Sequence, residues 1–389
     1  MFRSLTGTST GSGPTVPTLT KIWESTNVLH DTLARYGTGY NGKVYATDAS
    51  HKILYSWDSE GCQQTSVATG IGGGWACTCD NSGNILTNTG KWGTSFTDWQ
   101  IYSISNKSTQ ALAVSAPSGV TSGYIYANVA ATGNVLSSTG GSLYLAPAGQ
   151  KVAARIIVKS GAQDASSSSG PTYSEGTFSN EDAVAPLNVD NLTAETFMWR
   201  QRNGNINYIS GSTLKTYSQP SNKTTNTGFD AFKLKGVEYG VVPTGTYCAD
   251  GFSVFTLSDG EVVASRTETK TTTGAYYVSI KVEEVSDTKV NIYYYKAGDM
   301  AAMYTFEVPG GTVDVPIIES NQMIIYNNRE MLFVDGVEAA QIDLYTLTGQ
   351  KIRVVENQNE MSVAGLQGIY LVVVKDNSGL TRTGKIIVK

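Results

Sequence analysis

Between about residue 19 and residue 310 the chain alternates short apolar and polar stretches and has almost no helical period. Short runs rich in β-branched and aromatic residues recur instead, and such runs predict β-strands. Turns that contain glycine or asparagine, such as Asn81-Ser82-Gly83, separate the runs. The pattern therefore predicts an all-β fold.

The predicted strands come in repeating units, each with three strands followed by a weaker fourth. The clearest copy covers residues 73–114. Other copies begin near residues 33, 123, 195, 228 and 274. Starts that lie about 40 to 50 residues apart are typical of propeller blades, which stack around an axis because one sheet cannot bury both of its faces alone. We interpret residues 19–312 as a β-propeller with six blades, with five or seven left open, and a pair of β-sandwiches as the alternative.

The two ends of this body complement each other. The last unit, which ends at residues 303–308, is short of an outer strand, and Leu19–Trp23 has no unit of its own. We expect Leu19–Trp23 to supply the missing strand and close the ring. Residues 164–186, rich in serine, glycine and proline, are interpreted as a long surface loop, and residues 1–18 as a flexible leader.

The last 75 or so residues have a separate pattern. Residues 340–345 alternate like a half-buried strand, and the turn at 348–351 contains Gly349. A second tight turn at 365–368 precedes residues 369–374, whose β-branched and aromatic side chains predict a central strand buried on both faces. A final strand is predicted at 383–389. Residues 313–389 are therefore expected to form a small immunoglobulin-like β-sandwich.

In order and position, these blocks resemble the C-terminal sorting domain of type IX secretion cargo. The residues that carry the resemblance are Gly349, Gly365, Leu366, Gly368, Ile369, Tyr370 and Lys385. The resemblance implies the type IX machinery as a partner and the outer surface of a Bacteroidetes-type bacterium, or secretion, as the destination. Such cargo begins with a signal peptide, yet Met1–Thr10 has no apolar core of the needed length. We expect a trimmed chain, a misassigned start or a lost export route.

Composition narrows the partners. Charged residues are 16% of the chain and the formal net charge is −5, which argues against nucleic acid. No apolar run approaches the length of a transmembrane segment. The cysteines are Cys62, Cys77, Cys79 and Cys248. Their spacing fits neither a disulfide scaffold nor a metal site, so Cys77 and Cys79 are expected to be small buried residues, and neither metal nor cofactor is predicted.

The sequence contains no catalytic motif that we recognise. Of its two histidines, His51 follows an apparent turn. Asp80, Asp230 and Asp250 lie near predicted strand ends and are candidates for a glycosidase-type pair, with turn formation as the alternative role. An enzyme, a glycan lyase or hydrolase, is therefore kept only as an alternative function.

Aromatic residues are the better clue to a ligand. Trp75 and Trp199 are expected on equivalent innermost strands lining the central channel, with Tyr124 and Tyr126 as further ligand contacts. Aromatic rings stack on sugars or anchor peptides, although the same rings can instead fill the space between blades. We predict a binding protein for a glycan or a surface protein, with a scaffold for protein partners as a further alternative.

Overall fold

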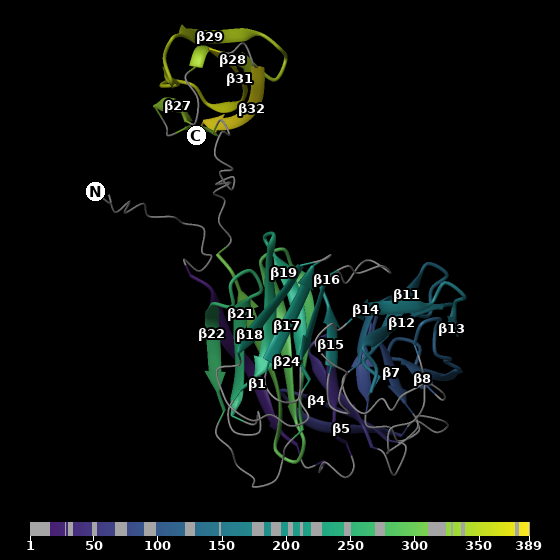
Figure 1. Ribbon diagram of the computed structural model, residues 1–389. Coiled ribbons are helices and arrows are strands. Elements are labelled where there is room, and N and C mark those ends of the chain that lie inside the picture. Colours follow the sequence, from purple (N-terminus) through teal and green to yellow (C-terminus); the bar gives the residue numbers. More distant parts are fainter. Residues whose placement is uncertain are drawn as a thin grey trace. The chain divides into compact units, whose positions relative to one another are not determined.

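The computed structural model describes nineteen segments of the chain: residues 16–27, 29, 34–48, 53–66, 76–88, 99–120, 129–147, 149–172, 183–187, 196–200, 205–210, 213–218, 228–244, 250–268, 277–309, 324–327, 330–335, 339–377 and 381–388. Every regular element in these segments is a β-strand, so the predicted all-β fold is confirmed. None of the described residues belongs to a helix that could cross a membrane. The chain divides into two compact units, Met1–Gly310 and Gly311–Lys389 (Figure 1).

Unit 1 contains six antiparallel sheets in its described segments. Sheet 1 consists of β2 (Gly37–Tyr40), β3 (Lys43–Thr47), β4 (Ile53–Asp58) and β5 (Gly61–Ser66). Sheet 2 consists of β6 (Cys77–Cys79), β7 (Asn84–Asn88), β8 (Trp99–Ser103) and β9 (Ser108–Leu112). Sheet 3 consists of β10 (Ala130–Asn134), β11 (Gly140–Leu145), β12 (Val152–Lys159), β13 (Ala162–Gln163) and β14 (Ser168–Thr172).

The other three sheets follow the same plan. Sheet 4 consists of β15 (Ala183–Pro186), β16 (Thr196–Arg200), β17 (Asn205–Ser210) and β18 (Thr213–Ser218). Sheet 5 consists of β19 (Asp230–Leu234), β20 (Val237–Pro243), β21 (Gly251–Thr256) and β22 (Val262–Thr267). Sheet 6 consists of β23 (Val278–Ser286), β24 (Lys289–Lys296), β25 (Met300–Glu307) and β1 (Thr18–Thr26).

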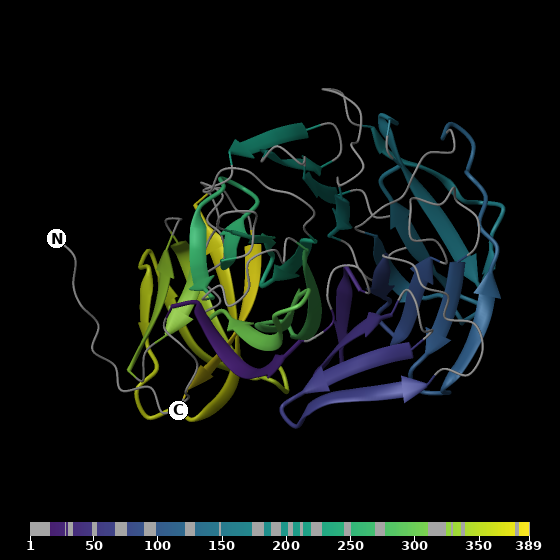
Figure 2. The same ribbon diagram turned by 90° about the horizontal axis from the view of Figure 1, so that it is seen from below.

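The first strands of the six sheets contact one another in cyclic order. Each of β2, β6, β10, β15, β19 and β23 touches the first strand of the next sheet, and β23 touches β2. The sheets follow each other in chain order in the view of Figure 2. Apolar side chains of neighbouring sheets pack together, for example in the cluster that joins sheets 2 and 3. The stacking hides the faces of sheets that could not bury themselves alone.

The ring is closed by the N-terminal strand. β1 pairs antiparallel with β25 from Thr18 opposite Glu307 to Thr26 opposite Met300, with one bulge near Trp23. The predicted role of Leu19–Trp23 as the missing strand of the last sheet is confirmed. Trp23 packs into the apolar cluster that sheets 1 and 6 share. Asn27 N donates to the carbonyl of Asp299 at 2.8 Å. Two ends of unit 1 that are distant in sequence thus share one sheet.

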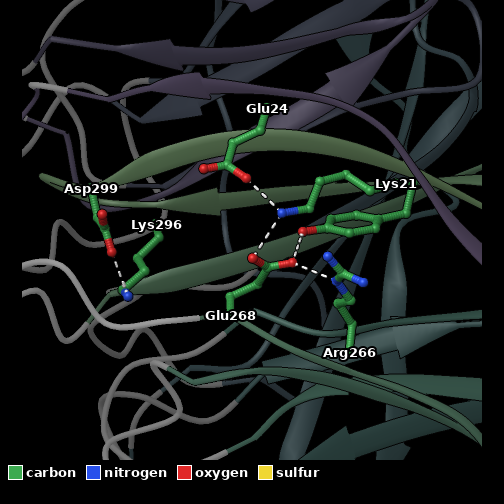
Figure 3. Close-up of polar contacts among 7 residues, drawn as sticks. Lys21, Glu24, Arg266, Glu268, Lys296 and Asp299 are labelled. Carbon is green, nitrogen blue, oxygen red and sulfur yellow. Dashed lines mark hydrogen bonds and ion pairs between the residues drawn. The ribbon is translucent and has the colours of Figure 1, made fainter.

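A charged network fastens β1 to sheet 5 as well. The Glu268 carboxylate, whose side chain is 8% exposed, lies 2.8 Å from Lys21 Nζ and 2.9 Å from Arg266 Nε (Figure 3). It also accepts a hydrogen bond from the Tyr304 hydroxyl of β25. Burial alone raises the pKa of Glu268, but the hydrogen bonds from Lys21, Tyr304 and Arg266 outweigh it and hold that pKa below its usual value. The network therefore strengthens ring closure while Glu268 is ionised.

We expect this contribution to disappear in acid. Because the pKa of Glu268 is lower in the folded than in the unfolded state, its stabilisation is complete above the unfolded value of about 4.3 and is lost as the pH falls through the folded value. At neutral pH, Glu268→Gln is expected to lower the free energy of unfolding by about 2 kcal/mol, measured by urea denaturation. The matched variant Glu24→Gln removes the half-exposed partner of Lys21 and should cost less than about 0.5 kcal/mol. Equal losses for the two variants at neutral pH, or a constant deficit of Glu268→Gln down to acid pH, would refute the assignment.

One predicted boundary in unit 1 is wrong. The stretch 164–186, predicted as loop, contains β14, which pairs with β12, and β15, the first strand of sheet 4. The predicted start of a unit near residue 123 lies outside the described residues, and the first described strand of sheet 3 is β10 at 130–134. Serine, glycine and proline signal turns locally, but pairing with a neighbouring strand overrode that preference.

Unit 2 contains two antiparallel sheets that share a core. One consists of β26 (Ile324–Asn327), β27 (Met331–Asp335) and β30 (Glu360–Ser362). The other, in pairing order, consists of β29 (Lys351–Glu356), β28 (Ala339–Thr346), β31 (Gly368–Asp376) and β32 (Thr381–Val388). Apolar residues of both sheets, including Leu332 and Val372, form one buried cluster.

The tail strands lie where the alternation predicted them, with one correction. β31 is central in its sheet, but only Tyr370, Val372 and Val374 are buried, while Ile369 is 38% exposed. The prediction that this strand is buried on both faces is wrong, because an antiparallel sheet of this kind packs one face on the core and leaves the other toward solvent. β-branched residues on the outer face reflect strand preference rather than burial.

The residues of the predicted sorting signature have identifiable roles in unit 2. Gly349, Gly365 and Gly368 all adopt positive φ, which explains glycine at these turns. Leu366 packs on the core and donates its N–H to the Val363 carbonyl, and the Tyr370 hydroxyl donates to the Gln367 carbonyl. Lys385 is exposed on β32.

Candidate functional site

A polar cavity of about 290 Å³ lies among the first strands of unit 1. Its walls come from β2, β19 and β23 and from the turn that follows β6. The polar and aromatic lining residues are Tyr40, Asp80, Asn81, Asp230, Phe232, Lys281, Glu283 and Glu284. The volume is at the lower end of the range of about 300–1,000 Å³ that is usual for small-molecule sites.

A narrow chamber of about 20 Å³ adjoins this cavity and shares Asp230 and Lys281 with it. The chamber is lined by residues from all six first strands or the residues next to them, among them Thr38, Thr78, Ala130, Val184, Phe229 and Ser279. Convergence of all six strands on one chamber identifies it as the axis of the ring. The candidate site is thus an axial one.

Asp80 binds the turn after β6 and the next sheet at once. One carboxylate oxygen accepts from the N–H groups of Ser82 and Asn84, each at 2.9 Å. The other accepts from Asn84 Nδ2 at 2.8 Å and from Val135 N of sheet 3 at 2.9 Å. Burial raises the pKa of the Asp80 carboxyl, although its hydrogen bonds act in the opposite direction. This residue forms a turn and also links sheets 2 and 3.

Asp230 links sheets 5 and 6 in the same manner. It accepts hydrogen bonds from Ala231 N at 2.9 Å and from Val282 N of β23 at 2.8 Å. The Lys281 ammonium lies 3.6 Å from the same carboxylate, and both side chains are largely buried. Among the described lining residues Lys281 is the only basic one, so these residues carry four carboxylates and one ammonium, a formal charge of −3.

Glu283 links sheets 6 and 1. One oxygen accepts from Asn41 N at 2.9 Å, and the other accepts from Asn291 Nδ2 at 3.0 Å and from the Tyr293 hydroxyl. Burial, followed by the hydrogen bond to Glu283, raises the pKa of Tyr293, so its hydroxyl stays protonated and can donate. The same hydroxyl accepts from Gly42 N at 2.8 Å.

Tyr40 contributes an aromatic ring to the cavity. Its ring lies against Gly83, where an added Cβ would come within 2.6 Å of the Tyr40 Cε1 atom. Burial raises the pKa of Tyr40, and the nearby Cys79, Glu283 and Asp80 groups raise it further. The neutral phenol of Tyr40 therefore lies near the acidic groups Glu283 and Asp80.

Of the four predicted ligand residues, the structure describes only the strand position of Trp199. Trp75, Tyr124 and Tyr126 lie outside the described residues. Trp199 is on β16, the second strand of sheet 4, so the prediction that it occupies an innermost strand is wrong. The innermost place is taken by β15, whose small residues Val184 and Ala185 are fully buried and suit the crowded axis. Trp99 and Tyr293–Tyr295 are buried in the core.

The other residues considered for catalysis or metal binding differ in where they lie. Of the three aspartates predicted near strand ends, Asp80 and Asp230 line the cavity, whereas Asp250 lies before β21 and lines neither cavity. Cys77 and Cys79 are buried, as predicted, and both are free thiols. Burial raises the pKa of both. His30, His51 and Cys248 fall outside the described residues. Among the described residues, no group of three His, Cys, Asp or Glu side chains could hold a metal ion.

Sequence reasoning missed Lys281, Glu283 and Tyr40. Lys281 and Glu283 belong to an alternating strand, where a charged residue ordinarily faces solvent. A signal was nevertheless present around Tyr40, since the Gly37-Thr38-Gly39 segment is unusually small for a strand. Glycine within a strand indicates close approach of another group.

No family model and no curated protein matches the chain. Among solved structures, it is similar to a DUF4623 family protein from Bacteroides eggerthii, with 10% identity, 77% of this chain and 76% of that chain covered, and a TM-score of 0.50. It also matches the PQQ-bound aldose sugar dehydrogenase of Streptomyces coelicolor, with 9% identity, 76% and 100% coverage and a TM-score of 0.41. A further match is the extracellular domain of a putative one-component system from Bacteroides thetaiotaomicron, with 10% identity, 89% and 48% coverage and a TM-score of 0.33. At 10% identity, the similarity to the DUF4623 family protein concerns the fold alone. The fold of this chain is all-β.

Proposed function

We propose that unit 1 is a six-bladed β-propeller that binds a small polar ligand, such as the end of a glycan, in its axial cavity. The cyclic contacts of the six first strands and the closure by β1 support the propeller interpretation. The observation that carries the binding function is the polar cavity at the axis, with an aromatic ring, an amide and several charged groups in its lining. Sites of this composition orient a ligand by a few convergent polar groups.

Binding is favoured over hydrolysis because of how the acids are used. Asp80, Asp230 and Glu283 each accept a backbone N–H from a neighbouring sheet. A catalytic acid or base must exchange its proton with the substrate, and these oxygens are already engaged in holding the ring together. We therefore assign the three acids mainly to structure and place Tyr40, Asn81, Lys281 and Glu284 as the candidate ligand contacts.

A glycan array probed with the full chain tests this function. Binding to at least one glycan is expected, and Lys281→Gln should change its affinity by about tenfold, because Lys281 lines both cavities. The matched control is Lys233→Gln on β19, which removes an exposed lysine that lines neither cavity. Thermal melts of both variants establish that they are folded. Equal binding by the two variants would rule out the axial site, and no binding to any glycan would favour a protein ligand or a scaffold.

We further propose that unit 2 is an immunoglobulin-like sorting domain that directs the chain through type IX secretion to the outer surface of a Bacteroidetes-type bacterium. Support comes from the resemblance of the tail blocks and from the turn geometry at Gly349, Gly365 and Gly368. Deletion of residues 311–389 in a type IX-competent host is expected to abolish surface delivery, measured by protease accessibility on intact cells. Undiminished delivery of the truncated chain would contradict the proposal.

A further inference from the structure

We propose that the axial cavity selects a ligand that carries a protonated amine together with hydroxyl groups, such as an amino sugar with a free amino group. This inference rests on the proposed binding function and specifies its ligand class. Three separate features of the described residues support it: the charge of the lining, the position of Tyr40, and a buried hydroxyl in the adjoining narrow chamber.

The formal charge of the described lining residues disfavours an anionic ligand. Lys281 is paired with Asp230 at 3.6 Å, so that carboxylate largely compensates its positive charge. Asp80, Glu283 and Glu284 are the other acidic residues among the described lining residues, with Glu284 exposed and Glu283 half-buried. Charges in a partly buried cavity interact more strongly than in water, so a carboxylate or sulfate would be repelled and an ammonium attracted.

Tyr40 gives the cation a second kind of contact. Its ring lines the same cavity as Glu283 and Glu284. The face of an aromatic ring attracts ammonium groups, and the attraction grows when the cation is shielded from water. A ring and carboxylates in one cavity therefore suit an ammonium better than a neutral group.

Thr38 supplies the evidence for a hydroxyl-bearing ligand or a bridging water. Its side chain is 3% exposed, and its Oγ1 atom has no hydrogen-bond partner among the described residues. Thr38 lines the narrow chamber that shares Asp230 and Lys281 with the cavity. An unpaired buried hydroxyl is costly, and a chamber of about 20 Å³ is large enough for one water molecule or one ligand hydroxyl. The Thr38 hydroxyl thus lacks a hydrogen-bond partner among the described residues, and a sugar hydroxyl or a bound water molecule can provide one.

Isothermal titration of the full chain with matched oligosaccharides tests the inference. The probes are a chitosan trimer with free amines, a chitin trimer in which the amines are acetylated, and an oligouronate, at about pH 6, where a primary amine is protonated. We expect chitosan to bind at least about tenfold more tightly than chitin, the oligouronate not to bind, and added salt to weaken chitosan binding. Equal affinities for chitosan and chitin, or binding of the oligouronate, would overturn the inference.

Variants locate the effect in the cavity. Glu284→Gln should weaken chitosan binding about fivefold, whereas Glu261→Gln, which removes one exposed acid elsewhere, should not change it. Tyr40→Phe keeps the ring and should bind like the parent, while Tyr40→Leu should bind about fivefold more weakly.

Equal effects of the two glutamate variants would show that binding depends on overall charge and refute a site in the cavity. If chitin and chitosan bind equally but Lys281→Gln changes the affinity for both, only the amine preference fails. If no glycan binds at all, the proposed function fails with it.

Discussion

Removal of residues 1–26 is expected to abolish the cooperative unfolding of unit 1. The deletion removes β1 and leaves the outer edge of β25 without its hydrogen-bonded partner from Met300 to Glu307. It also takes Trp23 out of the core and leaves the buried Glu268 carboxylate without Lys21. These losses together are comparable to the whole stability of a domain, about 5–15 kcal/mol. Calorimetry should detect no sharp transition for unit 1, and the open strand edge should promote aggregation.

Complementation makes this prediction specific. A synthetic peptide covering residues 16–27 contains all of β1, and its addition should restore a cooperative transition. A peptide in which Lys21 and Trp23 are both replaced by alanine is the matched control and should restore it poorly. Deletion of residues 1–15 keeps every pairing of β1, so it should leave the transition in place. A well-folded chain without residues 1–26 would mean that β1 does not close the ring.

Gly39→Ala is expected to destabilise unit 1 by about 3 kcal/mol, at the upper end of the usual cost of overpacking a core. A Cβ on Gly39 would lie 1.9 Å from Cγ of Tyr293, well inside any allowed contact. Tyr293 is 1% exposed, and its hydroxyl is held by Glu283 and by Gly42 N, so the ring cannot move away without breaking these bonds. Urea denaturation followed by tryptophan fluorescence measures the loss.

A double-mutant cycle identifies the clash as the cause. In a Tyr293→Ala background the added methyl group has space, and Gly39→Ala should then cost less than about 1 kcal/mol. Gly42→Ala is a useful comparison, because Gly42 has positive φ but no atom near its Cβ position. It should cost only the backbone strain, about 1 kcal/mol. Additive effects of Gly39→Ala and Tyr293→Ala would contradict the proposed contact.

The acids of the axial site show how function and stability share residues here. Asp80, Asp230 and Glu283 come from three different sheets, and each accepts a backbone N–H from the sheet that follows in the ring. The arrangement places carboxylates around the axis and at the same time holds neighbouring sheets in position. Substitution of these three is therefore expected to disturb folding, which is why the ligand tests use Lys281, Glu284 and Tyr40 instead.

Most strands of the chain could be predicted from local alternation and turn residues. β7, β11 and β28 are examples, because a short run of strand-forming residues and a glycine-containing turn are properties of a few adjacent residues. The pairing of β1 with β25 was also predictable, since one unit lacked a strand and one strand lacked a unit. β15 was missed because four residues of small side chains, ending in proline, have no strand signal without their partner strand.

The amino-acid sequence by itself determined that this protein is built of β-strands, where most of them run, and that its N-terminal strand completes its last sheet. Only the tertiary structure decided which side chains meet at the axis. Tyr40, Asp80, Asp230 and Lys281 are separated by up to 241 positions, and each is an ordinary strand or turn residue in its local context. Their meeting depends on which strand of each sheet lies innermost and on how the sheets are rotated against each other. Those quantities arise from packing between sheets, so no local pattern contains them.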